Sequence, residues 1–520
     1  MQVNKVALQD TQSFSQFFID YLSNKRELAS FYGLRPEIDS FAKQIEKKSF
    51  SNAHRKVLCE VLEDQYEGYE VAPALAANLT DLGLPDTYTV TTGHQLNIFT
   101  GPLYFIYKIA TVVNACRELK AKYPDCNFVP VYWMASEDHD FDEISYFHLF
   151  GKKYQWACQD KGGVGRLSTD SLGPLLEELP EKVTLFEQAY RDHGNLADAV
   201  RCYVNELFGE DGLVVLDADD DRLKALFAPM IKDDLLRHTA NNLVEQTNSD
   251  LAELGYKTQI FPREINFFYL DEGVRERIVK VDGQYLVNNT KLSFSETEIL
   301  ALLDSNPEKF SPNVVMRPLY QEVILPNLAY VGGPAEVIYW LQLGKVFDEY
   351  DVAFPILLPR NFALYINGAS QKKLDKFAWT DEQLFQSVEE LQAQYVAAHG
   401  SDEVSLSEEY KNLEEVFEQL IQKAEVIDGS LKGFISAEHA KAIKSIDNIG
   451  KRLKKSEERK HETELNQIAT LKEKLFPSGG LQERHDNFLN FYINNPNFIK
   501  ELLVALDPFD LQMHVLKEEW

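Results

Sequence analysis

Short apolar runs alternate with amphipathic helical patterns over residues 81–380. Four of the runs end in a polar or glycine-rich turn: YTVTT, NFVPVYWMA, GLVVLDA and NLAYV. A fifth run, VAFPILLP, closes the series. Alternation of this kind is typical of a parallel β-sheet with helices between its strands. The pattern therefore predicts an α/β core over residues 81–380.

The rest of the chain is predicted to be mainly helical. Residues 1–80 carry apolar positions at helical spacing and are expected to pack on the core. Two stretches between the strands, about 151–205 and 222–315, are expected to be insertions. Residues 381–475 form long charged helical patterns that predict a coiled coil, with the tip of an antiparallel hairpin at 427–434. Residues 476–520 are expected to fold back on the core.

Four predicted strand ends carry polar residues or glycine. These ends are Gly93-His94-Gln95, Glu137 to Asp140, Asp217-Ala218-Asp219, and Gly332-Gly333-Pro334. Parallel α/β sheets bind ligands beyond the carboxyl ends of their strands. We therefore expect the four ends to contribute to one crevice.

The segment SEDHDFDE, at 136–143, is the densest polar cluster at these ends. Three interpretations stay open: a metal site, a catalytic carboxylate–histidine group, or a solvated loop. Its aspartates have the spacing of a calcium loop, but Glu143 occupies the position that requires glycine. Asp138 or Asp140 could orient His139 for proton transfer, or one of them could hold an amine.

Further candidates follow the first and fourth strands. The start of the helix after Thr100-Gly101-Pro102 could bind an anion, with His94 and Gln95 as hydrogen-bonding groups; a helix-capping turn is the alternative. Arg317 and Arg360 could each clamp a carboxylate or phosphate, or form a structural ion pair. Tyr339 and Trp340 cannot both face the same way, so at least one belongs to the core.

Charge and motif content exclude several functions. The net charge is −29, which argues against general nucleic-acid or anionic-membrane binding. The sequence has no P-loop, no GxGxxG after the first strand, no HExxH and no CxxC. Five widely spaced cysteines, the lack of a signal peptide and the lack of a long apolar run predict a cytoplasmic protein with reduced thiols.

Four motifs together resemble the bacillithiol biosynthesis cysteine-adding enzyme family. They are GHQLNIFTGPLYFIYKI, PVYWMASEDHDFDEI, NVVMRPLYQEVILPNLAYVGGPAEVIYWLQL and LQERHDNFLNFY, and they occur in the family's order along nearly the whole chain. Family members often carry Gly-Gln-Gln where this chain has Gly93-His94-Gln95. The resemblance implies a Rossmann-like core, similar to that of class I aminoacyl-tRNA synthetases and nucleotidyl transferases, with a helical coiled-coil domain that supports a homodimer.

The resemblance also implies an activity. The family is described as a ligase that adds cysteine to the amine of glucosaminyl malate, the last step of bacillithiol formation. ATP or ADP is the expected nucleotide, with Mg²⁺ if ATP is used, and no dedicated metal site is expected. Activation by ATP would pass through a cysteinyl adenylate or a cysteinyl phosphate.

Placed on this sequence, the resemblance assigns roles to the candidates. Asp138, His139 and Asp140 are the expected catalytic residues, with His139 as general base, and Arg317 or a helix start is expected to receive the malate carboxylates. The expected substrate and nucleotide contacts are Gly93, His94, Gln95, Asn97, Thr100, Gly101, Glu137, Arg317, Gly332, Gly333, Pro334, Glu336 and Tyr339.

Two alternatives compete with the ligase. One is a non-catalytic coiled-coil scaffold or metabolite-binding protein with a vestigial nucleotide-binding core. The other is a metal-dependent hydrolase built on Asp138, His139, Asp140 and Asp217.

Overall fold

The computed structural model describes residues 1–400 and 405–519, which form two compact units. The first unit comprises residues 1–367 and the segment from Gly480 onward. The second unit is Gly368–Gly479. The C-terminal segment therefore belongs to the same unit as the N-terminal part of the chain.

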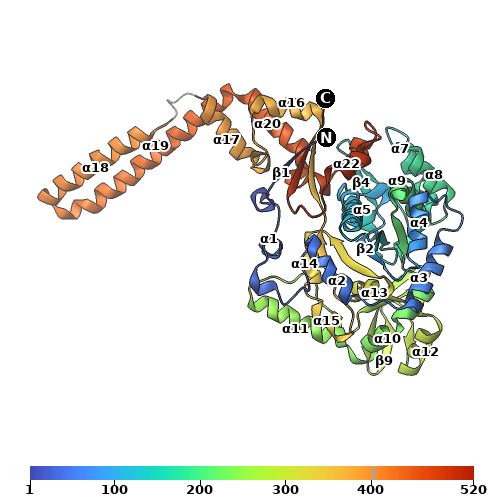
Figure 1. The fold of residues 1–520 in the computed structure, drawn as a ribbon. Coiled ribbons are helices and arrows are strands. Elements are labelled where there is room, and N and C mark those ends of the chain that lie inside the picture. The colour runs from blue at the N-terminus through green and yellow to red at the C-terminus, as the bar shows by residue number, and fades with distance from the viewer. Residues whose placement is uncertain (401–404, 520) are drawn as a thin grey trace. The chain divides into compact units, whose positions relative to one another are not determined.

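A five-stranded parallel sheet forms the centre of the first unit (Figure 1), in the order β13–β12–β2–β3–β6. Its strands are β2 (Thr87–His94), β3 (Asn127–Met134), β6 (Val214–Asp217), β12 (Asn327–Gly332) and β13 (Ile356–Pro359). These are the five apolar runs of the sequence, so the predicted parallel-sheet core is confirmed. The chain adds β3 and β6 on one side of β2 and then returns to place β12 and β13 on the other side. The reversal between β2 and β12 is a topological switch point, where such sheets bind ligands.

Helix α5 (Tyr104–Lys122) follows β2 and is buried on nearly every face, from Phe105 to Cys116. Its side chains are mostly apolar, so burial between layers offsets the cost of ordering it. On one side, the Nδ2 of Asn114 donates hydrogen bonds to the carbonyl oxygens of Leu503 and Leu506, at 2.9 and 2.7 Å. These carbonyls stand at the end of α22 (Phe498–Ala505), so the C-terminal segment covers α5. The N-terminal helices are α1 (Gln16–Leu22), α2 (Phe41–Lys47), α3 (Asn52–Gln65) and α4 (Pro73–Asp81).

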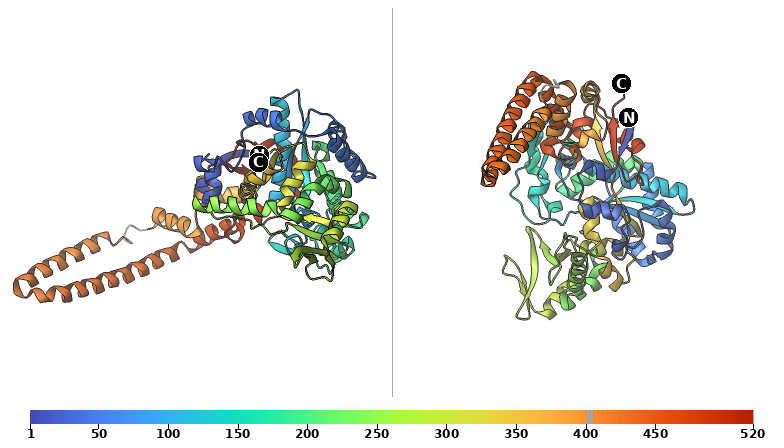
Figure 2. Two further views of the ribbon diagram at one scale, coloured as in Figure 1. Left: turned by 90° about the horizontal axis from the view of Figure 1, so that it is seen from below. Right: turned by 90° about the vertical axis from the view of Figure 1, so that its left-hand side faces the viewer.

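Two long connections link strands of the parallel sheet. Between β3 and β6 lie α6 (Phe141–Ile144), β4 (Tyr146–Leu149), β5 (Lys152–Gln155), α7 (Gly173–Glu178), α8 (Thr184–Asp192) and α9 (Leu196–Phe208). Between β6 and β12 lie α10 (Asp221–Arg237), α11 (Thr239–Glu253), β7 (Phe267–Asp271), β8 (Val274–Val281), β9 (Gln284–Val287), β10 (Ser293–Phe294), α12 (Glu296–Ser305), β11 (Phe310–Pro312) and α13 (Met316–Ile324). The five strands of the second connection form an antiparallel sheet, β10–β9–β8–β7–β11, visible in the right-hand view of Figure 2. After β12 come α14 (Pro334–Trp340) and α15 (Gly344–Glu349), and α21 (Leu489–Tyr492) precedes α22.

The two ends of the chain meet in a small third sheet. Strand β1 (Gln2–Val6) pairs antiparallel with β15 (Met513–Lys517), which pairs parallel with β14 (Phe362–Ile366). Figures 1 and 2 show β1 and the C-terminal strand side by side. The sequence predicted mainly helices at both ends and missed β1 and β15. Their partners lie at opposite ends of the chain, so no local hairpin signal marks them.

The second unit is helical throughout its regular structure. Its helices are α16 (Gly368–Phe377), α17 (Val388–His399), α18 (Ser407–Ile427), α19 (Lys432–Lys460) and α20 (Glu462–Leu475). Helices α18 and α19 run antiparallel along their length, as the left-hand view of Figure 2 shows. The hydroxyl of Tyr410 donates to Asp447, and Phe417 stacks on His439 with ring centroids 4.7 Å apart. The predicted hairpin is therefore confirmed; the predicted helical stretch 381–475 also contains 401–404, which lie outside the described residues.

Candidate active site

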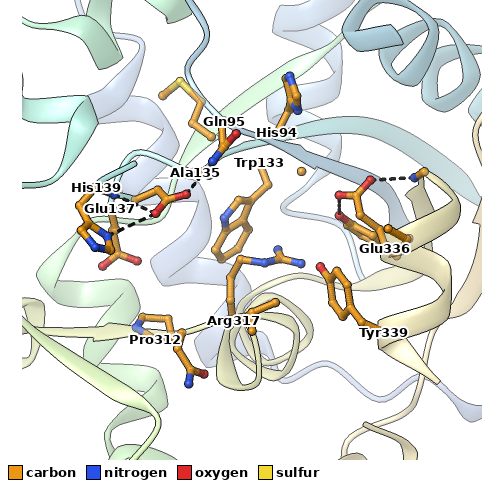
Figure 3. A pocket seen from close by; sticks show the side chains of 18 of the residues that line it. His94, Gln95, Trp133, Ala135, Glu137, His139, Pro312, Arg317, Glu336 and Tyr339 are labelled. Atoms are coloured by element: carbon orange, nitrogen blue, oxygen red, sulfur yellow. Dashed lines mark hydrogen bonds and ion pairs between the residues drawn. The ribbon is translucent and has the colours of Figure 1, made fainter. Parts of the chain in front are cut away.

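A pocket of about 580 Å³ lies at the carboxyl ends of β2, β3 and β12, at the switch point of the sheet. This volume is in the range of small-molecule sites. Eleven of the predicted site residues line it: Gly93, His94, Gln95, Glu137, Asp138, His139, Arg317, Gly333, Pro334, Glu336 and Tyr339. In Figure 3, Glu137 and His139 stand on one side of the pocket, Glu336 on the other, and Arg317 with Tyr339 between them.

Asp138 is held by three hydrogen-bond donors. Gln95 donates from Nε2 to Oδ2 at 2.9 Å, and the backbone N–H of His139 donates to Oδ1 at 2.8 Å. Arg275 approaches Oδ1 with Nη1 at 3.5 Å. Although burial alone would raise the pKa of Asp138, these contacts hold it well below its usual range. The side chain is therefore a fixed negative charge.

The His139 ring is held by an arginine rather than by a carboxylate. Nη1 of Arg275 lies 2.7 Å from the ring Nδ1, whereas Oδ1 of Asp138 lies 3.6 Å away. A guanidinium can only donate hydrogen bonds, so Nδ1 must accept and the neutral ring carries its proton on Nε2. In this arrangement Nε2–H is a hydrogen-bond donor.

Glu137 occupies the same side of the pocket. Its Oε1 accepts a hydrogen bond from Lys224, whose side chain is fully buried. Burial raises the pKa of Glu137 to about 7, with Asp219 adding to the rise and Lys224 opposing it.

The opposite side of the pocket is organised by Glu336. Its Oε2 accepts from Lys108 Nζ at 2.6 Å and from the Gly333 N–H at 2.7 Å, and its Oε1 accepts from the Tyr330 hydroxyl at 2.8 Å. Burial alone would raise the pKa of Glu336, but these partners lower it. Because Glu336 takes the Gly333 N–H, this N–H at the helix start is not free for a ligand anion. His94 lies beside the cluster, where burial, followed by the charge of Lys108, lowers its pKa to about 3.

Arg317 has no acidic partner among residues 1–400 and 405–519. Nη1 donates to Oε1 of Gln321 at 3.1 Å, while Nη2 is buried with no hydrogen bond in the described part of the chain. Three aromatic rings surround the guanidinium, those of Trp133, Tyr330 and Trp340, with ring centroids 5.5 to 5.9 Å from its carbon. Cation–π contacts offset only part of the cost of burying a charge. Arg317 is therefore a cation that an anionic ligand would stabilise.

Arg360 forms a structural ion pair, the second of the two roles that the sequence left open for it. Its Nη2 lies 2.5 Å from Oε1 of Glu483, and both side chains are almost fully buried. Of the two aromatic residues that could not face the same way, Tyr339 lines the pocket and Trp340 is fully buried in the core.

Five predicted site residues lie outside the pocket lining: Asn97, Thr100, Gly101, Asp140 and Gly332. Asn97 donates from Nδ2 to the carbonyl of Glu143 at 2.9 Å. Gly101 has a φ of +61°, and a Cβ there would lie 2.5 Å from Cβ of Asn97. These residues shape the turn between β2 and α5. Asp140 is exposed just before α6.

The end of β6 does not reach the pocket. Asp217 accepts a hydrogen bond from Ser136, and neither Asp217 nor Asp219 lines the cavity. The expectation that all four strand ends share one crevice is thus wrong for β6, because β6 is the edge strand beyond β3 and the switch point lies between β2 and β12. No group of three or more His, Cys, Asp or Glu side chains positioned to hold a metal ion occurs within 1–400 and 405–519.

Several lining residues escaped the sequence analysis. Arg275 and Arg277 come from β8, where their spacing of two residues puts them on one face of the strand. The alternation in VRERIVKV predicts that both arginines lie on one face of a strand. It does not predict that this face lies at the pocket. Lys108 was detectable in principle, because it is the one charged residue in the apolar stretch 105–116 of this helix. Arg263, Phe261 and Arg484 also line the pocket and come from loops or short turns that carry no such signal.

None of the helices in the described residues combines the length and apolar character needed to cross a bilayer.

Comparison with known proteins identifies the family. Residues 1–361 match the model "Bacillithiol biosynthesis BshC, N-terminal Rossmann-like domain", and residues 363–518 match "Bacillithiol biosynthesis BshC, C-terminal coiled-coil domain". The chain is 44% identical to a protein of Flavobacterium psychrophilum, over 99% of this chain and 100% of that protein. It is 42% identical to one of Christiangramia forsetii, over 99% of both chains, and 32% identical to one of Salinibacter ruber, over 95% and 94%. Each relative is named "Putative cysteine ligase BshC".

The matches cover both units and agree with the motifs, the Rossmann-like sheet and the helical hairpin. The chain therefore belongs to the bacillithiol biosynthesis BshC family.

Proposed function

We propose that the protein is a ligase that joins the carboxyl group of cysteine to the amine of glucosaminyl malate through an amide bond. The observation that carries this proposal is the pair of opposite charges in the pocket at the switch point. Arg317 is a buried cation without an acidic partner among the described residues, and Asp138, across the pocket, is an ionised carboxylate. Both substrates carry carboxylates and amines. A site with fixed charges of both signs suits them.

Arg317 would receive a carboxylate of the malate group. Its Nη2 has no hydrogen bond in the described chain, and the aromatic rings around it keep water away from the ion pair it would form. Asp138 would accept the α-ammonium of cysteine alongside its present donors, since a carboxylate has four lone-pair positions. His139 would donate from Nε2–H to a developing oxyanion.

Nucleotide-dependent activation of the cysteine carboxylate is part of the proposal. Arg317 and Arg484 line the pocket without an acidic partner among the described residues, which makes it suitable for phosphates despite the net charge of −29. ATP, accompanied by Mg²⁺, would supply the leaving group that makes the carboxyl carbon reactive. The free cysteines of the chain fit the reducing cytoplasm, where this reaction would take place.

We also propose a homodimer formed through the α18–α19 hairpin. Val426 and Ile427 are 87% and 80% exposed at its tip, and Phe434 is 64% exposed. Apolar side chains this exposed, on neighbouring turns, favour a protein contact. Sedimentation equilibrium should give a dimer, and Ile427→Glu with Phe434→Glu should give a monomer. Val504→Glu, at an exposed apolar side chain of α22, is the matched control and should stay dimeric.

The ligase is tested by incubating the purified protein with ATP, Mg²⁺, cysteine and glucosaminyl malate. Mass spectrometry would follow the amide product and AMP or ADP, whose identity names the activation route. Asp138→Asn and Arg317→Met should lose product, while Arg191→Gln, at an exposed surface ion pair, should retain it. If the folded wild type consumed no cysteine under these conditions, the ligase proposal would be overturned and the scaffold alternative would take its place.

A further inference from the structure

Amide formation requires a group that removes a proton from the attacking amine. The ammonium of the sugar first gives one proton to solvent. The free amine then attacks the activated carboxyl carbon, the C–N bond forms, and the electron pair of the breaking C–O bond leaves with the oxygen. The nitrogen must lose a second proton in this step. The identity of the acceptor rests on the proposed ligase function.

Two of the three carboxylates that line the pocket already accept hydrogen bonds through both of their oxygens. Asp138 accepts from Gln95 through Oδ2 and from the His139 N–H and Arg275 through Oδ1. Glu336 accepts through both oxygens from Lys108, the Gly333 N–H and the Tyr330 hydroxyl. The pKa of each is lowered by its partners. Neither is suited to take a proton at neutral pH.

The two histidines of the pocket are also poor acceptors. Nδ1 of His139 is occupied by Nη1 of Arg275, and Nε2 carries the ring proton. His94 is buried beside Lys108, and its pKa of about 3 keeps the ring neutral with little affinity for a further proton. Burial also raises the pKa of Tyr104 to about 12, so its phenol remains protonated.

Glu137 differs from all of these groups. Lys224 holds Oε1, and Lys224 is itself fixed by a 2.8 Å hydrogen bond to the carbonyl of Phe310. Oε2 has no hydrogen-bond partner within residues 1–400 and 405–519, and the side chain lines the pocket while only 12% exposed. It is thus a positioned carboxylate with one open oxygen.

We infer that Glu137, through Oε2, is the general base that accepts the proton of the attacking amine. Lys224 orients the carboxylate and keeps donating to Oε1 after the proton transfer. Asp219, which lies near Glu137, then helps to balance the charge of Lys224. Burial, with the repulsion of Asp219, gives Glu137 a pKa of about 7, which matches a base that works near neutral pH. His139 then acts as a hydrogen-bond donor rather than as the base.

The test compares two nucleophiles that differ in their need for a base. Hydroxylamine is less basic than the sugar amine and is largely unprotonated at neutral pH, so it can trap activated cysteine as the hydroxamate without help. Glu137→Gln should slow amide formation with glucosaminyl malate by about 10²- to 10⁴-fold and leave cysteine hydroxamate formation within a few-fold of wild type. Besides the deprotonation of the sugar ammonium, the wild-type amide rate should depend on an ionisation of the protein between about pH 6 and 8. This second dependence should disappear in Glu137→Gln and persist in His139→Gln.

Glu137→Gln leaves a buried ammonium unpaired, so the double variant Glu137→Gln/Lys224→Met serves as a second test should the single variant fail to fold. It should show the same selective loss of amide formation. Retention of the wild-type rate and pH profile by either folded variant would overturn the inference, as would loss of that profile in His139→Gln. A wild type that formed neither the amide nor the hydroxamate would overturn the proposed function and the inference with it.

Discussion

Nη1 of Arg275 donates a hydrogen bond to Nδ1 of His139 across 2.7 Å. Arg275 comes from β8 of the second insertion, and His139 follows β3 of the parallel sheet. The contact sets the tautomer of the His139 ring. It also makes the second insertion part of the pocket lining. The chemistry at the strand ends therefore depends on a residue that is not part of the Rossmann-like sheet.

Arg317→Met should weaken the binding of a carboxylate substrate. Methionine keeps much of the side-chain volume and removes the charge, so the KM of the substrate held by Arg317 should rise by about tenfold to a hundredfold. Steady-state kinetics with each substrate varied in turn would identify that substrate. Arg317→Lys should recover part of the effect, because lysine restores the charge but not the planar fork. Unchanged KM values for both substrates and for ATP would contradict the clamp.

Glu137 should make the stability of the protein depend on pH. An ordinary glutamate has a pKa of about 4.3, and that of Glu137 is raised to about 7 in the folded protein. Between these values the native state holds a proton that the unfolded state has lost, so the free energy of unfolding falls as pH rises and levels off above pH 7. The difference in unfolding free energy, wild type minus Glu137→Gln, should fall by about 3 kcal/mol from pH 4 to pH 8, measured by urea denaturation.

Asp138 provides the opposite sign in the same pocket. Its pKa is lowered on folding, so its contribution is present above the usual aspartate range and is lost as pH falls through it. The difference between wild type and Asp138→Asn should therefore grow as pH rises through the acid range. If the difference in unfolding free energy between wild type and Glu137→Gln did not change with pH, the pKa of Glu137 would not be raised in the folded protein.

Gly93, in β2, and Gly101, in the β2–α5 connection, should respond differently to alanine. A Cβ at Gly101 would lie 2.5 Å from Cβ of Asn97, and the φ of +61° disfavours a side chain, so Gly101→Ala should destabilise the protein by about 3 kcal/mol. A Cβ at Gly93 would meet the Tyr330 hydroxyl at 3.4 Å and Nη1 of Arg317 at 3.6 Å, which are ordinary contacts. Gly93→Ala should keep its melting temperature but bind ligands less tightly. Equal losses of stability in the two variants would argue against these separate roles.

The buried pair of Arg360 and Glu483 should behave as a structural unit. Glu483→Gln leaves the guanidinium without its counter-charge and should cost about 3 to 5 kcal/mol of unfolding free energy. Arg360→Met combined with Glu483→Leu removes both charges and should recover most of that loss. Chemical denaturation checks both values. If the double variant were no more stable than Glu483→Gln, the two side chains would contribute to stability by more than mutual charge neutralisation.

The sheet and three of its strand ends could be predicted from the sequence for a physical reason. Strands buried on both faces have continuous apolar runs, and NFVPVYWMA and NLAYV are of this kind. Parallel strands also bring their carboxyl ends to one edge, which is why Gln95 and Asp138 meet. The motifs added the family, which the comparisons confirm.

The remaining features depend on tertiary contacts that leave no local pattern. The edge position of β6 takes Asp217 away from the pocket, and the fold of the insertion brings in Arg275. From the sequence, Arg317 and Arg360 were equally good candidates for a ligand-binding cation. They differ because Glu483 pairs with Arg360 in the folded protein. The choice between Glu137 and His139 likewise depends on which neighbour each side chain contacts.

Activation of the cysteine carboxylate in this pocket is tested most directly by an isotope tracer. Cysteine labelled with ¹⁸O in its carboxyl group would be incubated with ATP, Mg²⁺, glucosaminyl malate and the protein. Each amide formed should be accompanied by one ¹⁸O in AMP or in inorganic phosphate, and Arg317→Met should lower the amide and the labelled product together. Amide formation without transfer of ¹⁸O to AMP or to inorganic phosphate would contradict nucleotide-dependent activation.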